Sequence, residues 1–289
     1  LTLDFRDRLR RELSGAVSFA VARQRALAGL VPPADAALLA SPNNILGIEY
    51  CKALLRQKAP LRPVTIRREG SAHDGALAPG AHPSASGLRS LLRQGRREEA
   101  LALLPPAMAR AYAAEEAAGR APVFRENSER AILARLRSMT EADFAALDQG
   151  REGLWNRLYD ASRTAATLQA LLEAAKTKRY ALARLRRMIL WAYLGLTPAD
   201  VPERMPYLRV LAASGTGCRL LAEMRTSAAA PVLTKPAQVR QLGPEARRLF
   251  AHEVRATDLY TLAYPRLEAA EGGTEWREGP VILGGPAPC

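Results

Sequence analysis

The chain has 289 residues, of which 48% are hydrophobic and 25% charged, and this globular composition excludes a disordered, collagen-like or disulfide-scaffold protein. Its 42 Lys and Arg against 29 Asp and Glu give a formal net charge of +13, which favours a polyanionic partner such as nucleic acid. Arginine and alanine are abundant along the whole chain, so coding bias is a second explanation for part of this charge.

The cysteines and histidines are scattered, without the close pairs that zinc sites use. We therefore expect no protein-bound structural metal. No apolar run approaches the ~20 residues of a membrane span, and the first residues are charged where a signal peptide is apolar. These features predict a cytoplasmic protein with no membrane partner.

The first part of the chain predicts helices followed by a strand. Helical spacing predicts two helices between Leu3 and Leu30. A turn at Pro42–Asn44 leads into a third helix, and Asn43 and Asn44 either cap it or bind a base or ribose. The apolar face of this helix holds Ile48, Cys51, Leu54 and Leu55.

The β-branched segment Pro63–Arg67 predicts a strand, and after a Gly-rich loop a helix begins near Ser84 or Ser86. Helix, strand, loop and helix together indicate an α/β fragment. Beyond Leu104 the pattern changes to long helical stretches. Near the end, YLRVLAA and APVLTK predict a small strand pair around a turn at Gly215–Gly217. We divide the chain into domains 1–100 and 101–289.

Two segments of the first domain have the character of anion sites. Arg67 and Arg68 end the predicted strand, where open α/β sheets present ligand contacts, and alternation leaves one of them facing a ligand. An ordinary exposed pair is the alternative. Ser84 and Ser86, with Arg89 one turn further on, place hydroxyls and free N–H groups at a helix N-terminus, where helix capping is again the alternative.

The segment from Lys176 to Leu194 predicts an amphipathic, strongly basic helix. Leu182, Leu185, Met188 and Ile189 form its apolar face, and its cationic arc holds Lys176, Arg179, Arg184, Arg186 and Arg187. Such an arc is able to neutralise several phosphates of a folded RNA. A solvated helix face explains the pattern equally well, so both interpretations stay open.

These segments, in this order, resemble the bacterial tRNA(Met) cytidine acetate ligases of the HIGH-type nucleotidyltransferase superfamily. The matching strings are SFAVARQRAL, SPNNILGIEYCKAL, VTIRREGSAHDG, SASGLRSLL, EGLWNRLYDAS, KTKRYALARLRRMILWAYLGL, YLRVLAASGTG, LTKPA and RATDLYTLAY. The resemblance implies an α/β nucleotidyltransferase-type, Rossmann-like partial domain in residues 1–100. A mostly α-helical, basic, tRNA-binding domain would follow in residues 101–289.

The resemblance implies ATP-dependent activation of acetate to acetyl-adenylate, with Mg²⁺, and acetyl transfer to N4 of the wobble cytidine of elongator tRNA(Met). By motif, it implies ATP contacts for Asn43, Asn44, Arg68, Ser84, Ser86 and Arg89. It implies tRNA contacts for Lys176, Lys178, Arg179, Arg184, Arg186 and Arg187. In the serine segment, Ser replaces the family's usual Thr, and Gly87-Leu88 replaces Ala-Ile.

The family begins with a strand and an HxGH motif, whose histidines would stabilise phosphate charge. No histidine precedes His73 in this sequence, so we expect the chain to lack that segment and assign no catalytic residue. Two alternatives follow. A non-catalytic RNA-binding remnant would bind RNA without chemistry, whereas a nucleotidyltransferase acting on a small phosphorylated molecule would turn over without RNA.

Overall fold

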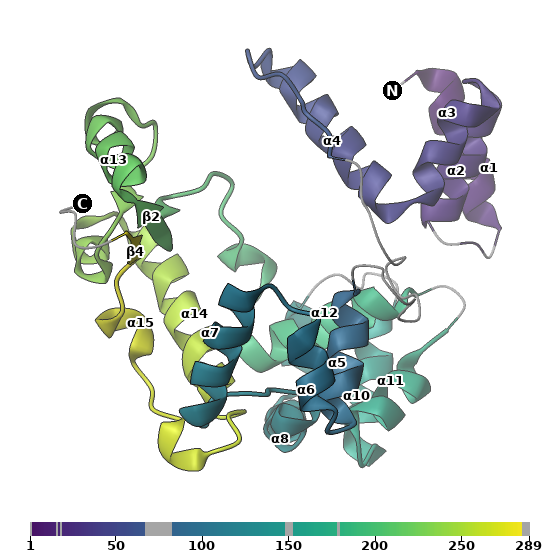
Figure 1. The fold of residues 1–289 in the computed structure, drawn as a ribbon. Helices are drawn as coiled ribbons and strands as arrows, with labels where there is room; N and C mark the ends of the chain where they lie inside the picture. Colours follow the sequence, from purple (N-terminus) through teal and green to yellow (C-terminus); the bar gives the residue numbers. More distant parts are fainter. Residues whose placement is uncertain are drawn as a thin grey trace. The chain divides into compact units, whose positions relative to one another are not determined.

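The computed structural model describes residues 2–66 except 16 and 18, then 83–147, 153–177 and 180–284. The chain forms two compact units. The first contains Leu1–Leu88 and Lys176–Leu185, and the second contains Arg89–Ala175 and Arg186–Cys289. Helices dominate the described part (Figure 1). Within the described residues, no helix combines the length and the hydrophobicity of a membrane span.

The first unit starts with the two helices predicted before Leu30. Helix α1 (Leu3–Ser14) packs against α2 (Phe19–Ala28), and α3 (Pro33–Ala37) with the 3₁₀ helix η1 (Leu38–Ala40) packs on α2. Thr2 caps α1 by accepting the N–H of Phe5 at 3.4 Å. The packing buries a small apolar core of Phe5, Ala22, Ala26, Ala36 and Leu39.

Helix α4 (Pro42–Gln57) begins earlier than predicted. Pro42 occupies its first turn behind the N-cap residue Ser41, so Asn43 and Asn44 are helical and do not form a separate turn. The apolar face expected on this helix is not buried. Cys51 is exposed, Leu55 is 80% exposed, and Ile48 and Leu54 are half-buried. The helix therefore forms from its local sequence without a buried side.

No strand forms over Pro63–Ile66, the described part of the predicted strand, and Arg67 lies outside the described residues. Val64 is 81% exposed and Ile66 is 93% exposed. A strand needs a neighbour for its backbone hydrogen bonds, and no described residue pairs with this segment. The strand prediction is therefore wrong for these residues.

The second unit is mostly helical, as predicted beyond residue 100. Its first part holds α6 (Arg97–Ala102), α7 (Pro106–Ala117), η2 (Arg125–Ser128), α8 (Glu129–Ser138), α9 (Glu141–Ala146), α10 (Leu154–Thr164) and α11 (Leu168–Ala175). The helices α5 (Ala85–Arg93) and α12 (Leu182–Leu194) begin in residues of the first unit and end in residues of the second. Helix α10 packs against α8, α9 and α11. The buried side chains of these helices include Leu136, Phe144, Leu158 and Leu171.

The C-terminal part holds η3 (Pro198–Asp200), β1 (Leu208–Arg209), β2 (Ala212–Ser214), α13 (Gly215–Ser227), β3 (Val232–Leu233), η4 (Pro236–Gln241), α14 (Pro244–Thr261), η5 (Leu267–Ala269), α15 (Thr274–Arg277) and β4 (Val281–Leu283). The predicted strand pair is confirmed, because β1 pairs with β3 in parallel. Strand β2 pairs in parallel with β4. The predicted turn at Gly215–Gly217 is wrong: these residues start α13, since the Ser214 hydroxyl accepts the Gly217 N–H at 3.2 Å.

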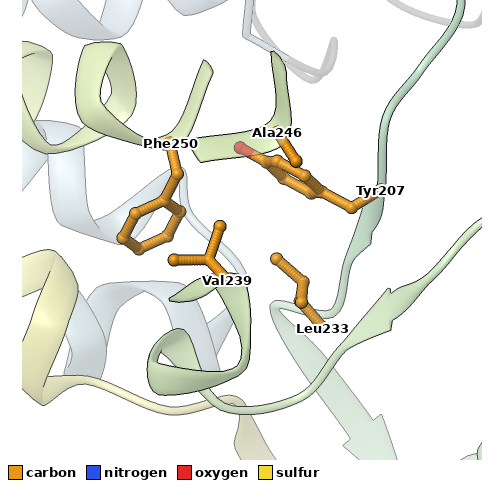
Figure 2. Close-up of a cluster of buried hydrophobic side chains, with 5 residues drawn as sticks. All are labelled: Tyr207, Leu233, Val239, Ala246 and Phe250. Atoms are coloured by element: carbon orange, nitrogen blue, oxygen red, sulfur yellow. The ribbon is translucent and has the colours of Figure 1, made fainter. Parts of the chain in front are cut away.

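A buried cluster joins the strand pair to η4 and α14 (Figure 2). It consists of Tyr207, Leu233, Val239, Ala246 and Phe250. The Tyr207 hydroxyl donates to a Glu253 carboxylate oxygen at 2.6 Å. Burial and this carboxylate raise the pKa of Tyr207 above its usual range. Tyr207 therefore stays a neutral hydrogen-bond donor that anchors α14.

Candidate functional site

Asn43 and Asn44 lie at the N-terminus of α4, and both are exposed. The first N–H groups of a helix lack an intrahelical acceptor, and the Ser41 side chain makes no capping hydrogen bond here. The first turn of α4 contains no acidic residue. Two amide side chains beside free N–H groups at the positive end of a helix suit a phosphate or a ribose.

The start of α5 holds Ser84, Ser86 and Arg89, which differ in burial and in their hydrogen bonds. Ser84 is 3% exposed, and its hydroxyl oxygen accepts the Gly87 N–H at 3.1 Å. The hydroxyl of Ser84 is thus the N-cap of α5. Ser86 is half-buried in the first turn and Arg89 is exposed one turn later. Ser86 and Arg89 are therefore better placed than Ser84 to meet a ligand directly.

The predicted ATP site is described only in part. Arg68 lies outside the described residues. Among the residues that are described, neither Asn43 nor Asn44 shares a hydrogen bond with the serine segment. Two helix N-termini with separate sets of donors are present, and their joining into one ATP site stays a prediction.

The basic helix is shorter than predicted. Helix α12 begins at Leu182, so Lys176 lies in the segment ahead of it, where its side chain is exposed. Lys178 and Arg179 lie outside the described residues. Tyr180 is only 6% exposed and is not helical. Burial of Tyr180 thus prevails over the helical periodicity that predicted a start at Lys176.

Within α12 the two predicted faces are present. Leu185, Met188 and Ile189 are buried, whereas Arg186 and Arg187 are exposed. In the part of the chain that the structure describes, neither exposed arginine forms an ion pair. Arg184 is half-buried, with its Cζ atom 5.5 Å from the centre of the Tyr180 ring. Arg186 and Arg187 are thus the uncompensated charges of this helix.

Several other arginines serve the fold, a role that the sequence analysis missed. Arg137 donates to the Ala165 carbonyl at 2.8 Å, Arg157 to that of Ala174 at 3.1 Å, and Arg255 to that of Leu194 at 3.1 Å. Each acceptor lies at or just beyond the C-terminus of a helix, where carbonyls lack intrahelical donors and carry partial negative charge. The sequence analysis attributed the positive charge to RNA binding or to coding bias. Part of that charge belongs to arginines that stabilise helix ends.

The second unit also contains a groove that the sequence analysis did not find, and we call it the aromatic groove. Its volume is about 350 Å³. It is lined by Val123, Phe124, Arg125, Ser128, Ile132, Leu190, Tyr193, Leu194, Ala256, Leu259 and Tyr260. Its three aromatic residues come from the segment before η2, from α12 and from α14. They are so distant in sequence that no local pattern brings them together.

Comparison with known proteins places this geometry in a family. The chain matches the HIGH Nucleotidyl Transferase model over residues 2–275. It is 30% identical to the tRNA(Met) cytidine acetate ligase of Acetivibrio thermocellus over 287 residues, which cover 95% of this chain and 69% of that relative. It is 28% identical to the Fervidobacterium nodosum protein of the same name, with 95% of this chain and 69% of the relative covered.

A solved structure agrees with these matches. The apo crystal structure of Thermotoga maritima TmcAL superposes with a TM-score of 0.90 at 26% identity, covering 97% of this chain and 70% of that chain. A second form of that protein, bound with alpha-thio ATP, has a TM-score of 0.85. The predicted nucleotidyltransferase-type fold is thereby confirmed.

Proposed function

Because this chain belongs to the HIGH nucleotidyl transferase family, and within it to the tRNA(Met) cytidine acetate ligases, we propose that it is an ATP-dependent acetate ligase. It would form N4-acetylcytidine at the wobble position of elongator tRNA(Met). Similarity to a curated ligase over 95% of the chain is the observation that carries this proposal. Since its RNA substrate would be a cytoplasmic tRNA, the proposal includes a cytoplasmic location.

The reaction has two steps. A carboxylate oxygen of acetate attacks the α-phosphorus of ATP, an O–P bond forms, and pyrophosphate leaves. The N4 amine of cytidine then attacks the acetyl carbonyl, a C–N bond forms, AMP leaves and the nitrogen loses a proton. Acetate, ATP and tRNA are all anions, so a chain with a net charge of +13 suits every substrate of this reaction.

For ATP, the proposal assigns Asn43 and Asn44 at the start of α4, Arg68, and the α5 segment of Ser84, Ser86 and Arg89. Support comes from the N–H groups at the start of α4, which have no capping side chain, and from the absence of acidic residues in the first turns of α4 and α5. Ser84 contributes by holding the first turn of α5 through its cap on Gly87. The Thermotoga maritima relative binds alpha-thio ATP.

The family reaction is expected to use Mg²⁺ with ATP. Among the described residues, no group of three or more His, Cys, Asp or Glu side chains is arranged to hold a metal ion. We therefore assign no residue of this chain to Mg²⁺. ATP phosphates are themselves ordinary ligands of this ion.

For tRNA, the proposal assigns the segment from Lys176 to Arg187. Its members are Lys176, Lys178, Arg179, Arg184, Arg186 and Arg187. Arg186 and Arg187 are exposed and form no ion pair within the described residues, so phosphate contacts would replace only water around them. This pair should contribute most to RNA affinity.

The test is formation of N4-acetylcytidine by the protein produced from its gene. Elongator tRNA(Met) transcript, ATP and labelled acetate are the substrates, and initiator tRNA(Met) is the control RNA. Product that requires both ATP and acetate is expected. RNA binding without product supports the non-catalytic RNA-binding remnant. Turnover of a small phosphorylated molecule without RNA supports a nucleotidyltransferase that acts on such molecules. Either result overturns the proposal.

The ATP assignment has its own test. Asn43→Ala is expected to raise the KM for ATP, because the amide lies at the helix end that would face phosphate or ribose. Gln57→Ala, at the opposite end of the same helix, is the matched control. An unchanged KM in Asn43→Ala and Asn44→Ala would remove α4 from the ATP site.

A further inference from the structure

The aromatic groove has an apolar wall of which part remains accessible. Phe124, Tyr193 and Tyr260 line it together with Leu190. Tyr260 is 54% exposed and Leu190 is 50% exposed. A half-exposed tyrosine ring beside an apolar surface is the arrangement on which proteins stack unpaired bases.

The rim of the groove is positively charged. Arg125 lines it, and Arg255 donates to the carbonyl of the lining residue Leu194 at 3.1 Å. Arg186 is four residues before Leu190 on α12, so the two side chains share a helix face. The exposed charge of α12 therefore continues directly into the aromatic groove.

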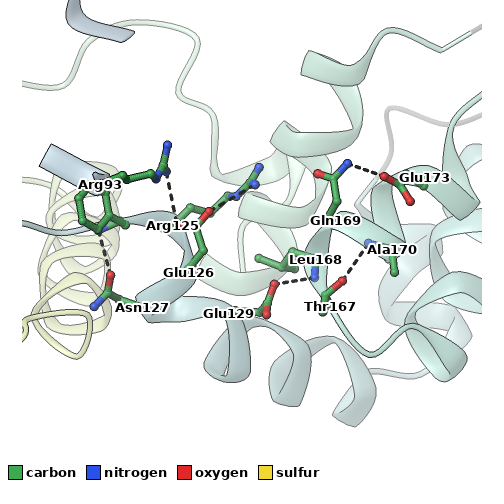
Figure 3. A network of polar contacts seen from close by, with 11 residues as sticks. Arg93, Arg125, Glu126, Asn127, Glu129, Thr167, Leu168, Gln169, Ala170 and Glu173 are labelled. Atoms are coloured by element: carbon green, nitrogen blue, oxygen red, sulfur yellow. Dashed lines mark hydrogen bonds and ion pairs between the residues drawn. The ribbon is translucent and has the colours of Figure 1, made fainter. Parts of the chain in front are cut away.

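The acidic side chains near the groove are already engaged. Glu126 is shared by two arginines, with Arg93 at 3.2 Å and Arg125 at 3.7 Å (Figure 3). The Glu129 carboxylate accepts the Leu168 N–H at 2.8 Å. On α14, the Asp258 carboxylate accepts the Gly273 N–H at 2.7 Å. Among the described residues, no acidic side chain lines the groove itself. The local charge thus favours a polyanion over an acidic protein surface.

We propose that the aromatic groove binds unstacked bases of a single-stranded tRNA loop, with the flanking phosphates paired to Arg125 and Arg186. The inference rests on the proposed tRNA substrate and adds a base-stacking site to it. Phosphates alone would bind any RNA of similar charge, whereas a groove that stacks bases prefers a loop to a duplex. Charge and aromatic surface act together here because α12 contributes to both.

The experiment measures binding of the full chain to a fluorescein-labelled anticodon stem-loop of tRNA(Met) by fluorescence anisotropy. The same stem as a blunt duplex is the second probe. Tyr260→Leu should weaken loop binding by about 5- to 150-fold, the usual range for loss of one stacked base, because the ring is lost while apolar area is kept. Duplex binding should not change.

Three variants control this result. Tyr260→Phe keeps the ring and should bind like the unmodified chain. Tyr50→Leu makes the same substitution at a tyrosine that is 63% exposed on α4, and should also bind normally. Arg186→Gln should reduce the salt dependence of binding, whereas Tyr260→Leu should leave the salt slope intact. A thermal unfolding scan of each variant reports whether it is folded, and Leu190→Ser is a second groove variant.

The outcomes separate this inference from the proposed function. Normal loop binding by Tyr260→Leu and Leu190→Ser, with weakened binding by Arg186→Gln, would overturn the groove and keep the tRNA substrate. No binding of any RNA by the unmodified chain would overturn both. If sedimentation velocity shows that the chain self-associates and that Tyr260→Leu abolishes this, the groove contacts a second copy and the inference is wrong.

Discussion

Arg137 and Arg163 cap the C-termini of each other's helices. Arg163, on α10, donates to the carbonyl of Arg137 at 2.6 Å and to that of Leu136, at the end of α8. Arg137, on α8, donates to the carbonyl of Ala165 at 2.8 Å, just beyond the end of α10. Two cations thus neutralise the negative ends of two packed helices.

Arg163→Ala should lower the free energy of unfolding by about 1–3 kcal/mol, because carbonyls at the end of α8 lose charged donors. The variant also loses the contact of the guanidinium with the Tyr159 ring, whose centre is 4.7 Å away. Arg163→Lys keeps the charge but lacks a planar fork of donors, so it should recover only part of the loss. Urea unfolding followed by circular dichroism gives the free energy of unfolding of the unmodified chain and of both variants.

The control for this prediction is Arg186→Ala, which removes an exposed arginine that forms no ion pair in the described part of the chain. Its effect should stay within about 0.5 kcal/mol, as for ordinary surface substitutions. Equal losses of stability in Arg163→Ala and Arg186→Ala would show that the carbonyl contacts of Arg163 contribute nothing specific.

Ser84→Ala should destabilise α5 by about 1 kcal/mol, because the buried hydroxyl that accepts the Gly87 N–H is removed. Ser84→Thr should keep most of the cap, since threonine is also an N-cap residue and adds no charge to this buried position. Ser90→Ala, on the exposed side of the same helix, is the control. The unfolding midpoint measures each variant, and a midpoint for Ser84→Ala equal to that of Ser90→Ala would contradict the cap.

Asp200 should make the stability of the protein depend on acid pH. Burial opposes its charge, but hydrogen bonds from Thr197 at 2.8 Å and from His252 at 3.1 Å outweigh burial and lower the pKa of Asp200. A carboxylate with a lowered pKa stabilises the fold above its unfolded pKa of about 3.9. This stability is lost as the pH falls through the lower, folded pKa.

Asp200→Asn should therefore flatten the part of the decline of the urea midpoint that lies below about pH 5. Glu245→Gln, which changes an exposed carboxylate on α14, should keep the decline of the unmodified chain. A decline in Asp200→Asn as steep as in the unmodified chain would show that other carboxylates control acid stability.

Local sequence predicted the helices and the strand pair β1 and β3, because periodicity and capping residues act over a few positions. Local sequence failed where the structure of a segment depends on residues that are distant in sequence. Val64 and Ile66 have the residue types of a strand, but they remain exposed because no described residue pairs with them. At Lys176 it predicted a helix too early, because burial of Tyr180 was not visible in the pattern.

The candidate site was predictable to a similar extent. Arg186 is exposed on a helix, as the sequence predicted, whereas Asn43 is helical and not in the turn that the sequence predicted. The capping role of Ser84 was an open alternative, and its burial and its hydrogen bond with the Gly87 N–H favour it. The contact of Arg163 with the end of α8, and the groove that Phe124 and Tyr260 both line, involve residues far apart in sequence. Nothing in a local window distinguishes an arginine that caps a carbonyl from one that binds phosphate.

This distinction among arginines leads to the last prediction. Replacing Arg186 and Arg187 together with Gln should reduce the salt slope of tRNA binding by about 1.4 to 1.8, the value for two lost phosphate contacts. Arg225→Gln with Arg247→Gln removes the same charge from exposed positions on α13 and α14 and should leave the slope unchanged. Titrations of tRNA at several salt concentrations give both slopes. If the two double variants shift the slope equally, net charge and not α12 governs the affinity, because the position of the lost charge then has no effect.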